Sequence, residues 1–493
     1  MIRISTRLTT VFAGTSLVLG TSAFQLSCTQ TAQAPGATIV LTGARLIDGT
    51  GGAPIEQATV VIRDGRVQAA GPATTVPIPA GAVRVDVAGK TITPGLISAH
   101  SHVALQRLDK VSAEYAARWF DEEASLPDRD RLIGQLRIWA DYGITTVYTL
   151  GESNNRGFNT PAQVLEVVKV RDEQVELAEQ GTLDRARVYM AGPAMRGAGG
   201  PIEDAKTPEE VRQNATVYVK TPEEGRQNVI RNATLYRADF IKIDIDPGLP
   251  LPPPVYTAMI DEARKRGLRT AAHVETLEEA RGVVNAGIHA LAHSVRDQDV
   301  DASLIAEMKT RGVGQIPTLM QEEASFLYET TPAFFNDPFF LRHVDAFRKQ
   351  MEGLKDPAFQ RQISNDKVAQ TSKPQLRQAM RNLKILSDAG VLIALGTDSG
   401  GQRHAGYWPG FFEHREMELM VQSGLTPMQV VVAATSGSAR VMGLEGQLGT
   451  LEPGKWADLV VLNANPLTDI RNLRKIDAVW IAGRRLTRPA SAN

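Results

Sequence analysis

Thr91-Ile-Thr-Pro-Gly-Leu-Ile-Ser-Ala-His-Ser-His102 is the most informative stretch of this chain. The apolar run Thr91–Ala99 predicts a buried strand, and His100 and His102 follow at its C-terminal end. Residues two apart in a strand point to the same face and lie about 7 Å apart along it. Both imidazoles can therefore close on one divalent metal ion. Alone the pair is a weak signal, because two polar residues at a strand end give the same pattern without binding a metal.

Four further polar residues occupy or end short apolar segments that also predict strands, namely Lys242, His273, His293 and Asp398. His273 and His293 are 20 residues apart (293 − 273), which fits one helix plus one strand. Each residue alone has an ordinary explanation, since a histidine at a strand end is often structural and a strand lysine usually extends to water. Jointly, polar groups at the C-terminal ends of successive strands are typical of a TIM-barrel active site.

Strands and helical patterns alternate from about Thr91 to Glu445, which predicts a (β/α)₈ barrel. An open doubly wound sheet is the alternative, but only a closed sheet brings the ends of its first, fourth, fifth, sixth and eighth strands together. The strands that we predict are Thr91–Ala99, Thr145–Leu150, Arg187–Ala191, Phe240–Ile245, Arg269–His273, Ile288–His293, Gly314–Thr318 and Val391–Thr397.

Short strand patterns separated by Gly-rich turns occupy residues 38–90, and further ones follow at 457–462 and 478–483. Because they stand at opposite ends of the chain, we predict one small β-sandwich built from residues 38–90 and 450–488. The barrel then spans residues 91–449.

With these residues the chain resembles the amidohydrolase superfamily, and within it the branch of imidazolonepropionase-like enzymes, barrel-type Xaa-Pro dipeptidases and ochratoxin-cleaving amidases. The resemblance extends from Thr38 over nearly the whole chain and implies the same barrel and β-sandwich. The matching segments are Pro94–His102, Asp239–Ile243, His273, Ala290–His293, Gly396–Asp398 and Gly449–Val461.

Composition limits the classes of partner. Of 493 residues, 43% are hydrophobic and 22% are charged, as in a soluble globular protein, and the formal net charge is −1. Because 54 basic and 55 acidic residues are mixed without a long charged run, we expect no nucleic acid or anionic membrane surface as main partner. We expect a small-molecule amide or peptide substrate and a homo-oligomer.

Residues 1–28 predict a secretory signal peptide and hence a periplasmic or secreted protein. Arg3 and Arg7 precede a moderately apolar stretch, and small residues at 21–23 offer a cleavage site. The stretch is shorter than the roughly 20 apolar residues of a membrane span. The only cysteine, Cys28, is a candidate for lipid attachment, but Leu26 stands one position late for the usual lipidation motif. We therefore favour a cleaved form without a lipid.

Residues 320–386 form a predicted helical insertion between the seventh and eighth strands. The insertion is rich in phenylalanine, and we expect most of these rings to pack on one another or on the barrel. The functional alternative is a helical lid with an apolar substrate pocket, because loops after barrel strands face the active site.

His and Asp side chains are ligands that zinc accepts, and the lack of further cysteines argues against a structural cysteine site. We expect one Zn²⁺ at His100, His102 and Asp398 and a second at His273 and His293. Two cations need an anionic bridge, which an ordinary lysine does not supply near neutral pH. The resemblance implies that Lys242 is carboxylated and forms this bridge. A mononuclear site with unmodified Lys242 stays open.

The resulting hypothesis is hydrolysis of an amide C–N bond by metal-activated water, with Asp398 as both ligand and general acid/base. A dipeptide or N-acyl amino acid is the leading substrate class. A cyclic amide of the imidazolonepropionase type is the enzymatic alternative, and a non-catalytic scaffold is the alternative from another class. Arg296 either binds a substrate carboxylate or pairs with Asp297. The candidate substrate contacts are Tyr218, Arg296, His343 and His404, whereas His289 and His414 are expected to be structural.

Overall fold

The computed structural model describes residues 37–103, 128–151, 161–197, 217–245, 250–400 and 406–487, all of which belong to the unit formed by residues 35–493. The predicted signal peptide with Cys28 lies outside the described residues, and so does His404. None of the described helices combines the length and the apolar character that a membrane crossing requires.

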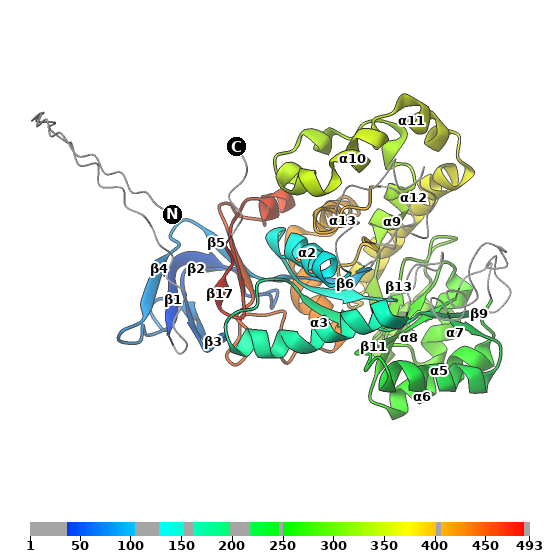
Figure 1. Ribbon diagram of the computed structural model, residues 1–493, viewed down its shortest axis with the longest axis horizontal. Helices are drawn as coiled ribbons and strands as arrows, with labels where there is room; N and C mark the ends of the chain where they lie inside the picture. Colours follow the sequence, from blue (N-terminus) through cyan, green and yellow to red (C-terminus); the bar gives the residue numbers. More distant parts are fainter. Residues whose placement is uncertain are drawn as a thin grey trace, which may run out of the picture. The chain divides into compact units, whose positions relative to one another are not determined.

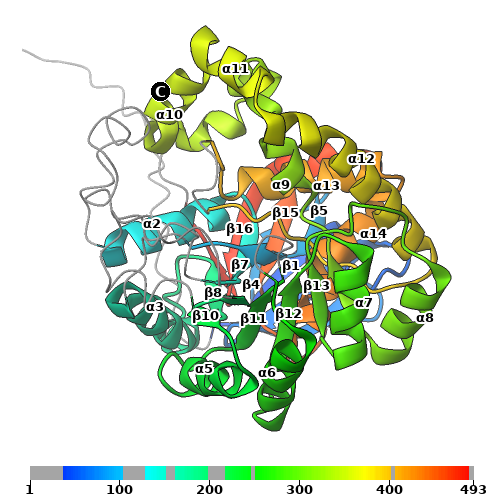
Figure 2. The ribbon, with the colours of Figure 1, turned by 90° about the vertical axis from the view of Figure 1, so that its right-hand side faces the viewer.

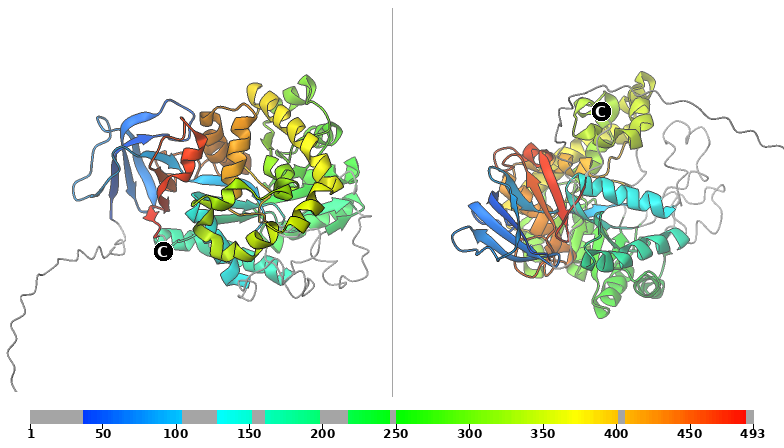
Figure 3. Two further views of the ribbon diagram at one scale, coloured as in Figure 1. Left: turned by 90° about the horizontal axis from the view of Figure 1, so that it is seen from above. Right: turned by 60° about the vertical axis from the view of Figure 1, so that its left-hand side comes forward.

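Strands from both ends of the chain form one eight-stranded sheet (Figure 1). Its order is β17-β16-β15-β5-β1-β2-β3, and β4 pairs with β1. The N-terminal and C-terminal strands lie side by side in both views of Figure 3. The two ends of the chain therefore share one hydrogen-bonded β unit. The strands are β1 (Ile39–Leu46), β2 (Ile55–Arg63), β3 (Arg66–Pro72), β4 (Val83–Asp86), β5 (Thr91–Pro94), β15 (Leu459–Leu462), β16 (Ile476–Ile481) and β17 (Arg484–Arg485).

Parallel strands form two further sheets, with helices around them in Figure 2. One has the order β6-β7-β8 and the other the order β10-β9-β11-β12-β13-β14. The amide of Asp239 donates to the carbonyl oxygen of Met190 at 2.8 Å, which links the end of β8 to the start of β11. The strands are β6 (Leu96–Ser101), β7 (Ile144–Thr149), β8 (Arg187–Met190), β9 (Met195–Gly197), β10 (Val217–Val219), β11 (Phe240–Asp244), β12 (Arg269–His273), β13 (Ala290–Ala292) and β14 (Gly314–Ile316).

Helices follow most of the parallel strands along the chain. In Figure 2, α3, α5, α6, α7 and α8 lie outside the strands. The α-helices are α2 (Asp128–Asp141), α3 (Pro161–Glu179), α5 (Pro222–Thr234), α6 (Pro253–Lys265), α7 (Leu277–Ala286), α8 (Ala302–Arg311), α9 (Leu319–Ala324), α10 (Val344–Leu354), α11 (Pro357–Ser364), α12 (Lys367–Asp388), α13 (Phe411–Gln422), α14 (Pro427–Val432) and α15 (Ser438–Met442). Shorter helical turns are η4 (Leu327–Glu329), η5 (Ala333–Asn336), η6 (Phe340–His343), η7 (Ala433–Gly437) and η8 (Ile470–Arg474).

The predicted strand Thr91–Ala99 is divided at Gly95, which corrects its boundaries. Its first part, β5, pairs with β15 in the eight-stranded sheet, hereafter the terminal sheet. Its second part, β6, pairs with β7. A side chain at Gly95 would collide with Thr145, because a Cβ there would lie 2.1 Å from Oγ1 of that residue. The glycine therefore lets one extended segment pass from one sheet to the other.

The predicted eighth strand, Val391–Thr397, is an extended segment with an isolated bridge from Ile393 to β14, and a second bridge joins Ser399, just after it, to Ser101 of β6. Its ladder is interrupted because the amide of Leu395 donates to the carbonyl oxygen of Ala433 in η7 rather than to a strand. The amides of Thr397 and Asp398 both donate to the carbonyl oxygen of His100. The segment therefore brings Asp398 to the end of β6.

The insertion between β14 and residue 391 is helical, from α9 to α12. Its aromatic rings pack on one another and on the segment that contains α13. Phe334, Phe335 and Phe340 form a cluster with Trp408 and Phe411, at centroid distances between 4.9 and 6.3 Å. These rings serve core packing, which is the first of the two interpretations of the insertion.

A buried ion pair fastens the terminal sheet to the parallel strands. Nε of Arg187, at the start of β8, donates to Oδ2 of Asp458, just before β15, at 2.9 Å. The side chains are only 2% and 3% exposed. Burial alone would lower the pKa of Arg187, but Asp458 outweighs that effect and raises it, so the guanidinium stays charged.

Candidate metal centre

His100, His102 and Asp398 meet at the C-terminal end of β6. Nε2 of His102 lies 2.7 Å from Oδ1 of Asp398, and Nε2 of His100 lies 3.1 Å from the same oxygen. Gly396 allows this close approach, because a Cβ there would lie 2.8 Å from Cβ of His100. The end of β6 and the extended segment that ends at Asp398 thus place three potential ligands around one point.

His293 and His273 extend the cluster along the strand ends. The ring centroid of His293 lies 4.7 Å from that of His100 and 4.2 Å from that of His273. One ligand atom each of His100, His293 and Asp398 lie within 4.8 Å of one another. The structure therefore brings together the four histidines and the aspartate that the sequence predicts as ligands.

His100 gives the clearest sign that this cluster suits a metal. Its side chain is completely buried, Nδ1 has no hydrogen-bond partner among the described residues, and Nε2 faces Oδ1 of Asp398 at 3.1 Å. Polar atoms buried without a partner are costly, so they are rare unless a ligand satisfies them. Burial lowers the pKa of His100 to about 3, and the charge of Lys242 acts in the same direction. The ring is therefore neutral, as a metal ligand must be.

Hydrogen bonds orient the other three rings. Nδ1 of His102 faces a backbone carbonyl oxygen after β7 at 2.8 Å, and Nδ1 of His293 faces Oγ1 of Thr318 at 2.7 Å. A ring that donates from Nδ1 keeps Nε2 available as a ligand. His273 has the opposite arrangement, because its Nε2 lies 3.2 Å from Oε1 of Glu275. Such partners are typical of histidines that bind metals.

Asp398 is an ionised oxygen donor. Burial alone would raise the pKa of Asp398, but the imidazoles of His102 and His100 outweigh burial and hold the pKa well below its usual value. Burial alone would lower the pKa of His102, but the nearby carboxylate of Asp398 outweighs burial and raises it. The donor set of imidazole nitrogens and a carboxylate oxygen fits zinc.

Lys242 lies on β11 with a side chain only 3% exposed, and its Nζ is 3.7 Å from Oδ1 of Asp244. Burial lowers the pKa of Lys242, although the charges of Asp244 and Asp398 oppose the shift. Asp244 also forms an ion pair with Arg196 on β9. Tyr218 on β10 stands opposite Arg196 in register, and its contact with substrate stays a prediction.

Three residues at these strand ends have a left-handed backbone. Their φ angles are 69° at His293, 60° at Asp398 and 47° at Thr318. Residues other than glycine rarely adopt this conformation, which costs on the order of 1–3 kcal/mol each. The concentration of such strain around one cluster indicates a functional site.

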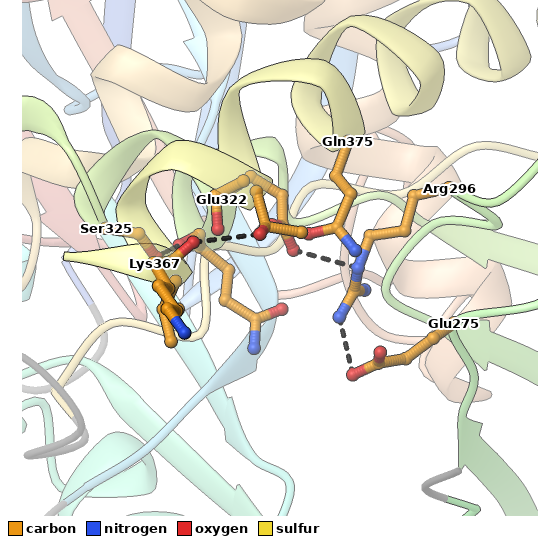
Figure 4. A pocket seen from close by; sticks show the side chains of 10 residues that line it. Glu275, Arg296, Glu322, Ser325, Lys367 and Gln375 are labelled. Atoms are coloured by element: carbon orange, nitrogen blue, oxygen red, sulfur yellow. Dashed lines mark hydrogen bonds and ion pairs between the residues drawn. The ribbon is translucent and has the colours of Figure 1, made fainter.

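Arg296 lies on the wall of a cavity of about 260 Å³ (Figure 4). Its Nη2 is 2.5 Å from Oε1 of Glu275, and its Nε is 3.2 Å from Oε1 of Glu322. The side chain is only 7% exposed, yet Nη1 has no hydrogen-bond partner in the described part of the chain. Of the two interpretations, the pairing with Asp297 is not formed, because Arg296 pairs with Glu275 and Glu322 and Asp297 accepts from the amide of Leu277.

His343 lies away from the cluster. Its Nε2 is 3.0 Å from Oδ2 of Asp141, and its ring packs against Tyr142, just before β7 begins. The predicted metal ligands gather at the opposite, C-terminal ends of the strands, so the geometry removes His343 from the predicted substrate contacts.

His289 and His414, the remaining histidines of the described residues, have structural partners. Nδ1 of His289 accepts from the amide of Thr270 at 3.1 Å, and Nε2 of His414 donates to the carbonyl oxygen of Tyr142 at 2.8 Å. Burial lowers the pKa of His289 to about 4 and that of His414 to about 3, so both rings are neutral.

Three carboxylates near the cluster were not predicted from the sequence. Asp244 and Glu275 stand two residues after Lys242 and His273, and strand parity could have indicated them. Glu413 accepts from the hydroxyl of Ser101 at 3.0 Å, but it comes from α13, and no local pattern connects it with the site.

A model of the amidohydrolase family matches residues 141–486. The chain belongs to the amidohydrolase family. This amidohydrolase is a hydrolase that acts on carbon–nitrogen bonds, and the resemblance predicted from the sequence is confirmed. Members of the family are typically metal-dependent, which agrees with the cluster of ligands.

Relatives of this amidohydrolase act on different compounds. The 5-methylthioadenosine/S-adenosylhomocysteine deaminase of Symbiobacterium thermophilum is 24% identical over 453 residues, covering 86% of this chain and 85% of the relative. The imidazolonepropionase of Sphingopyxis alaskensis is 24% identical over 441 residues, covering 83% of this chain and 86% of the relative. The structure of Aspergillus niger ochratoxinase has a TM-score of 0.69 at 20% identity and covers 92% of this chain and 97% of its own. That structure supports an α/β fold of the TIM-barrel type.

Proposed function

We propose that this amidohydrolase binds two zinc ions in the cluster and hydrolyses an amide bond of a small substrate. His100, His102 and Asp398 would hold one ion, and His273 and His293 the other, with a carboxylated Lys242 between them. The observation that carries the proposal is the buried His100, whose Nδ1 has no partner among the described residues and whose Nε2 faces the ionised carboxylate of Asp398. If the parallel strands close into a barrel of eight, all these strand ends face one mouth.

Bound divalent cations polarise a carbonyl group and lower the pKa of water. The chain itself supplies the proton transfer. Asp398 is ionised and can accept a proton from the attacking water and deliver it to the leaving amine. Nε2 of His102 lies 2.7 Å from Oδ1 of Asp398, so both side chains can reach the same ion.

Lys242 is suited to carboxylation. Its burial and lowered pKa increase the fraction of neutral amine, which is the form that reacts with CO₂. The reaction forms an N–C bond and releases one proton, and the carbamate that results is an anion with two oxygen ligands. An unmodified Lys242 would instead favour a site with a single metal.

We infer that the substrate carries a carboxylate close to the scissile amide, as dipeptides and N-acyl amino acids do. The support is Nη1 of Arg296, a buried donor without a partner at the cavity. Glu275 faces both Arg296 and His273, so this cavity adjoins the metal ligands. By formal charge, Glu275 and Glu322 outweigh the guanidinium of Arg296, and Lys367 in the cavity lining supplies a second cation that balances them.

Two other functions remain as competitors. A cyclic amide is the alternative substrate, because a relative with the name imidazolonepropionase aligns over most of the chain. A non-catalytic scaffold is the less favoured alternative, because the potential ligands lie together around Asp398.

We further propose that the mature protein acts outside the cytoplasm, in the periplasm or secreted. The support is the N-terminal sequence alone, with Arg3 and Arg7 before an apolar stretch and small residues at 21–23. Fractionation of cells that produce the full chain tests this localisation, and retention of the protein in the cytoplasm would contradict it.

The decisive assay uses zinc-loaded protein with dipeptides, N-acyl amino acids and the same compounds with an amidated carboxylate. Metal content is measured on the same sample. Turnover that prefers the free carboxylate supports the proposal. Much less than one metal ion per chain would refute the metal centre, and equal turnover of the amidated compounds would refute the role of Arg296. Turnover of cyclic amides alone would favour the competing function.

A further inference from the structure

Helix α13 carries two buried glutamates, three residues apart, whose burial the predicted ligand set does not explain. Glu413 and Glu416 are both 0% exposed. Hydrogen-bond donors surround each carboxyl group, and no cation of the described chain forms an ion pair with either one. Burial of a carboxyl group is unfavourable unless hydrogen bonds replace its contacts with water, so the partners of these two groups are the feature to explain.

Glu413 contacts the residues beside the ligands of β6 and the following segment. Its Oε1 accepts from Oγ of Ser101 at 3.0 Å, from Oγ1 of Thr397 at 3.2 Å and from Oγ of Ser399 at 3.0 Å. Ser101 separates the two histidines at the end of β6, and Thr397 and Ser399 flank Asp398. One carboxylate oxygen therefore joins the two segments that carry three ligands.

These contacts also maintain a strained turn. Asp398 has a φ of 60°, and the amide of Ser399 donates to Oγ1 of Thr397 across it at 3.0 Å. The hydroxyls of Thr397 and Ser399 both donate to Glu413, so the turn is held in place on both sides of Asp398. A strained residue persists only when its surroundings determine its conformation in this way.

Glu416 acts on the other half of the cluster. Its two oxygens accept from the amides of Leu319 and Met320 at 2.8 and 2.6 Å, the first amides of α9. The residue before them, Thr318, has a φ of 47°, and its hydroxyl contacts Nδ1 of His293. Glu416 thereby fixes the turn that orients this ring.

We propose that α13 positions the ligands for the cations of the proposed function. Glu413 fixes Asp398 and the histidines of β6, and Glu416 fixes Thr318 and through it His293. Both glutamates are positioning residues, because neither is a predicted ligand. The inference rests on the proposed metal centre. It concerns how one helix fixes the ligands on β6 and at Asp398 relative to His293.

The test uses the full chain with substitutions that leave every predicted ligand in place. Glu413→Gln removes the carboxylate from α13, and Thr397→Val removes one of its donors with little change of shape. Glu416→Ala removes the cap of α9. Glu418→Gln is the matched control, because Glu418 lies on the same helix but pairs with Arg415 and Arg474. Zinc affinity is measured by competition with a chelator, and the absorption spectrum of the Co²⁺-substituted protein reports the ligand geometry.

We expect zinc affinity to fall about tenfold to hundredfold in the Glu413, Thr397 and Glu416 variants, with an altered cobalt spectrum, and to stay unchanged in Glu418→Gln. A folded variant with wild-type affinity and spectrum overturns the role of the residue that was changed. If Glu413→Gln does not fold, Thr397→Val decides the role of Glu413. Wild-type protein that binds neither zinc nor cobalt would refute the proposed function itself, which distinguishes the two failures.

Discussion

Nη2 of Arg296 lies 2.5 Å from Oε1 of Glu275, and that oxygen also faces Nε2 of His273 at 3.2 Å. One carboxylate thus connects a buried guanidinium on a cavity wall with a predicted metal ligand. A substrate bound at the cavity would therefore lie next to the metal centre, and changes at Arg296 should affect substrate binding more than the fold.

Arg296→Lys is expected to raise KM for N-acyl amino acids about tenfold or more, with a smaller change in kcat. Lysine keeps the charge but lacks the planar fork that binds a carboxylate through two parallel hydrogen bonds. Steady-state kinetics on free and amidated substrates measure the effect. Arg281→Lys is the control, because Arg281 pairs with Asp301 at the surface. An equal rise in KM for amidated substrates would speak against carboxylate binding.

Asp398→Asn is expected to lower kcat by about 10²- to 10⁴-fold with the fold retained, because an amide cannot accept the proton that the proposed reaction transfers. The circular dichroism spectrum and the zinc content of the variant separate proton transfer from loss of folding or of metal. Turnover near the wild-type rate would rule out the assigned general acid/base role.

Lys242→Ala is expected to retain less zinc than the wild-type protein, because the anionic bridge is lost. A short carboxylic acid such as propionate should restore metal and part of the activity by occupying the place of the carbamate. Atomic absorption and activity measurements with and without the acid test this. Two zinc ions retained by the variant without added acid would contradict a bridging Lys242.

Glu416 should make stability depend on pH. Burial raises the pKa of Glu416 to about 8, with Glu323 and Glu413 adding to the shift and two backbone amides opposing it. A glutamate in the unfolded chain has a pKa of about 4.3. Between these values the folded state holds a proton that the unfolded state has released, so stability falls as pH rises from about 4.3 to about 8 and then levels off.

Glu416→Gln should remove this contribution to the slope, because glutamine does not titrate. The midpoint of urea unfolding, measured for both proteins at pH 5 and pH 8, gives the comparison. The wild type should lose more stability between the two pH values than the variant. Identical pH dependence in the two proteins would show that Glu416 does not titrate as its burial predicts.

Arg187→Ala is expected to destabilise the protein by about 3–5 kcal/mol, because it leaves Asp458 buried without its cation. The double variant Arg187→Met, Asp458→Leu removes both charges and should recover much of the loss. Urea unfolding of the two variants measures the difference. A single variant as stable as the wild type would mean that water or another group compensates Asp458.

The predicted ligands could be found in the sequence because each follows a local pattern. His100 and His102 stand two apart after an apolar run, and His273 and His293 end strands separated by one β/α repeat. The same patterns misplaced the boundary at Gly95, because the change from one sheet to another depends on a close approach to Thr145. They also gave no sign of Glu413, which is 312 residues away from Ser101.

Local periodicity was sufficient to predict the residues at the strand ends, and the resemblance of their motifs to a known superfamily predicted the family and the type of chemistry. The tertiary structure alone showed that Arg296 pairs with Glu275, that His343 points to Asp141, and that α13 contacts both halves of the cluster. The physical reason is that a strand's period is a property of its own residues. The partner of a buried charge, in contrast, depends on which distant segments pack against it.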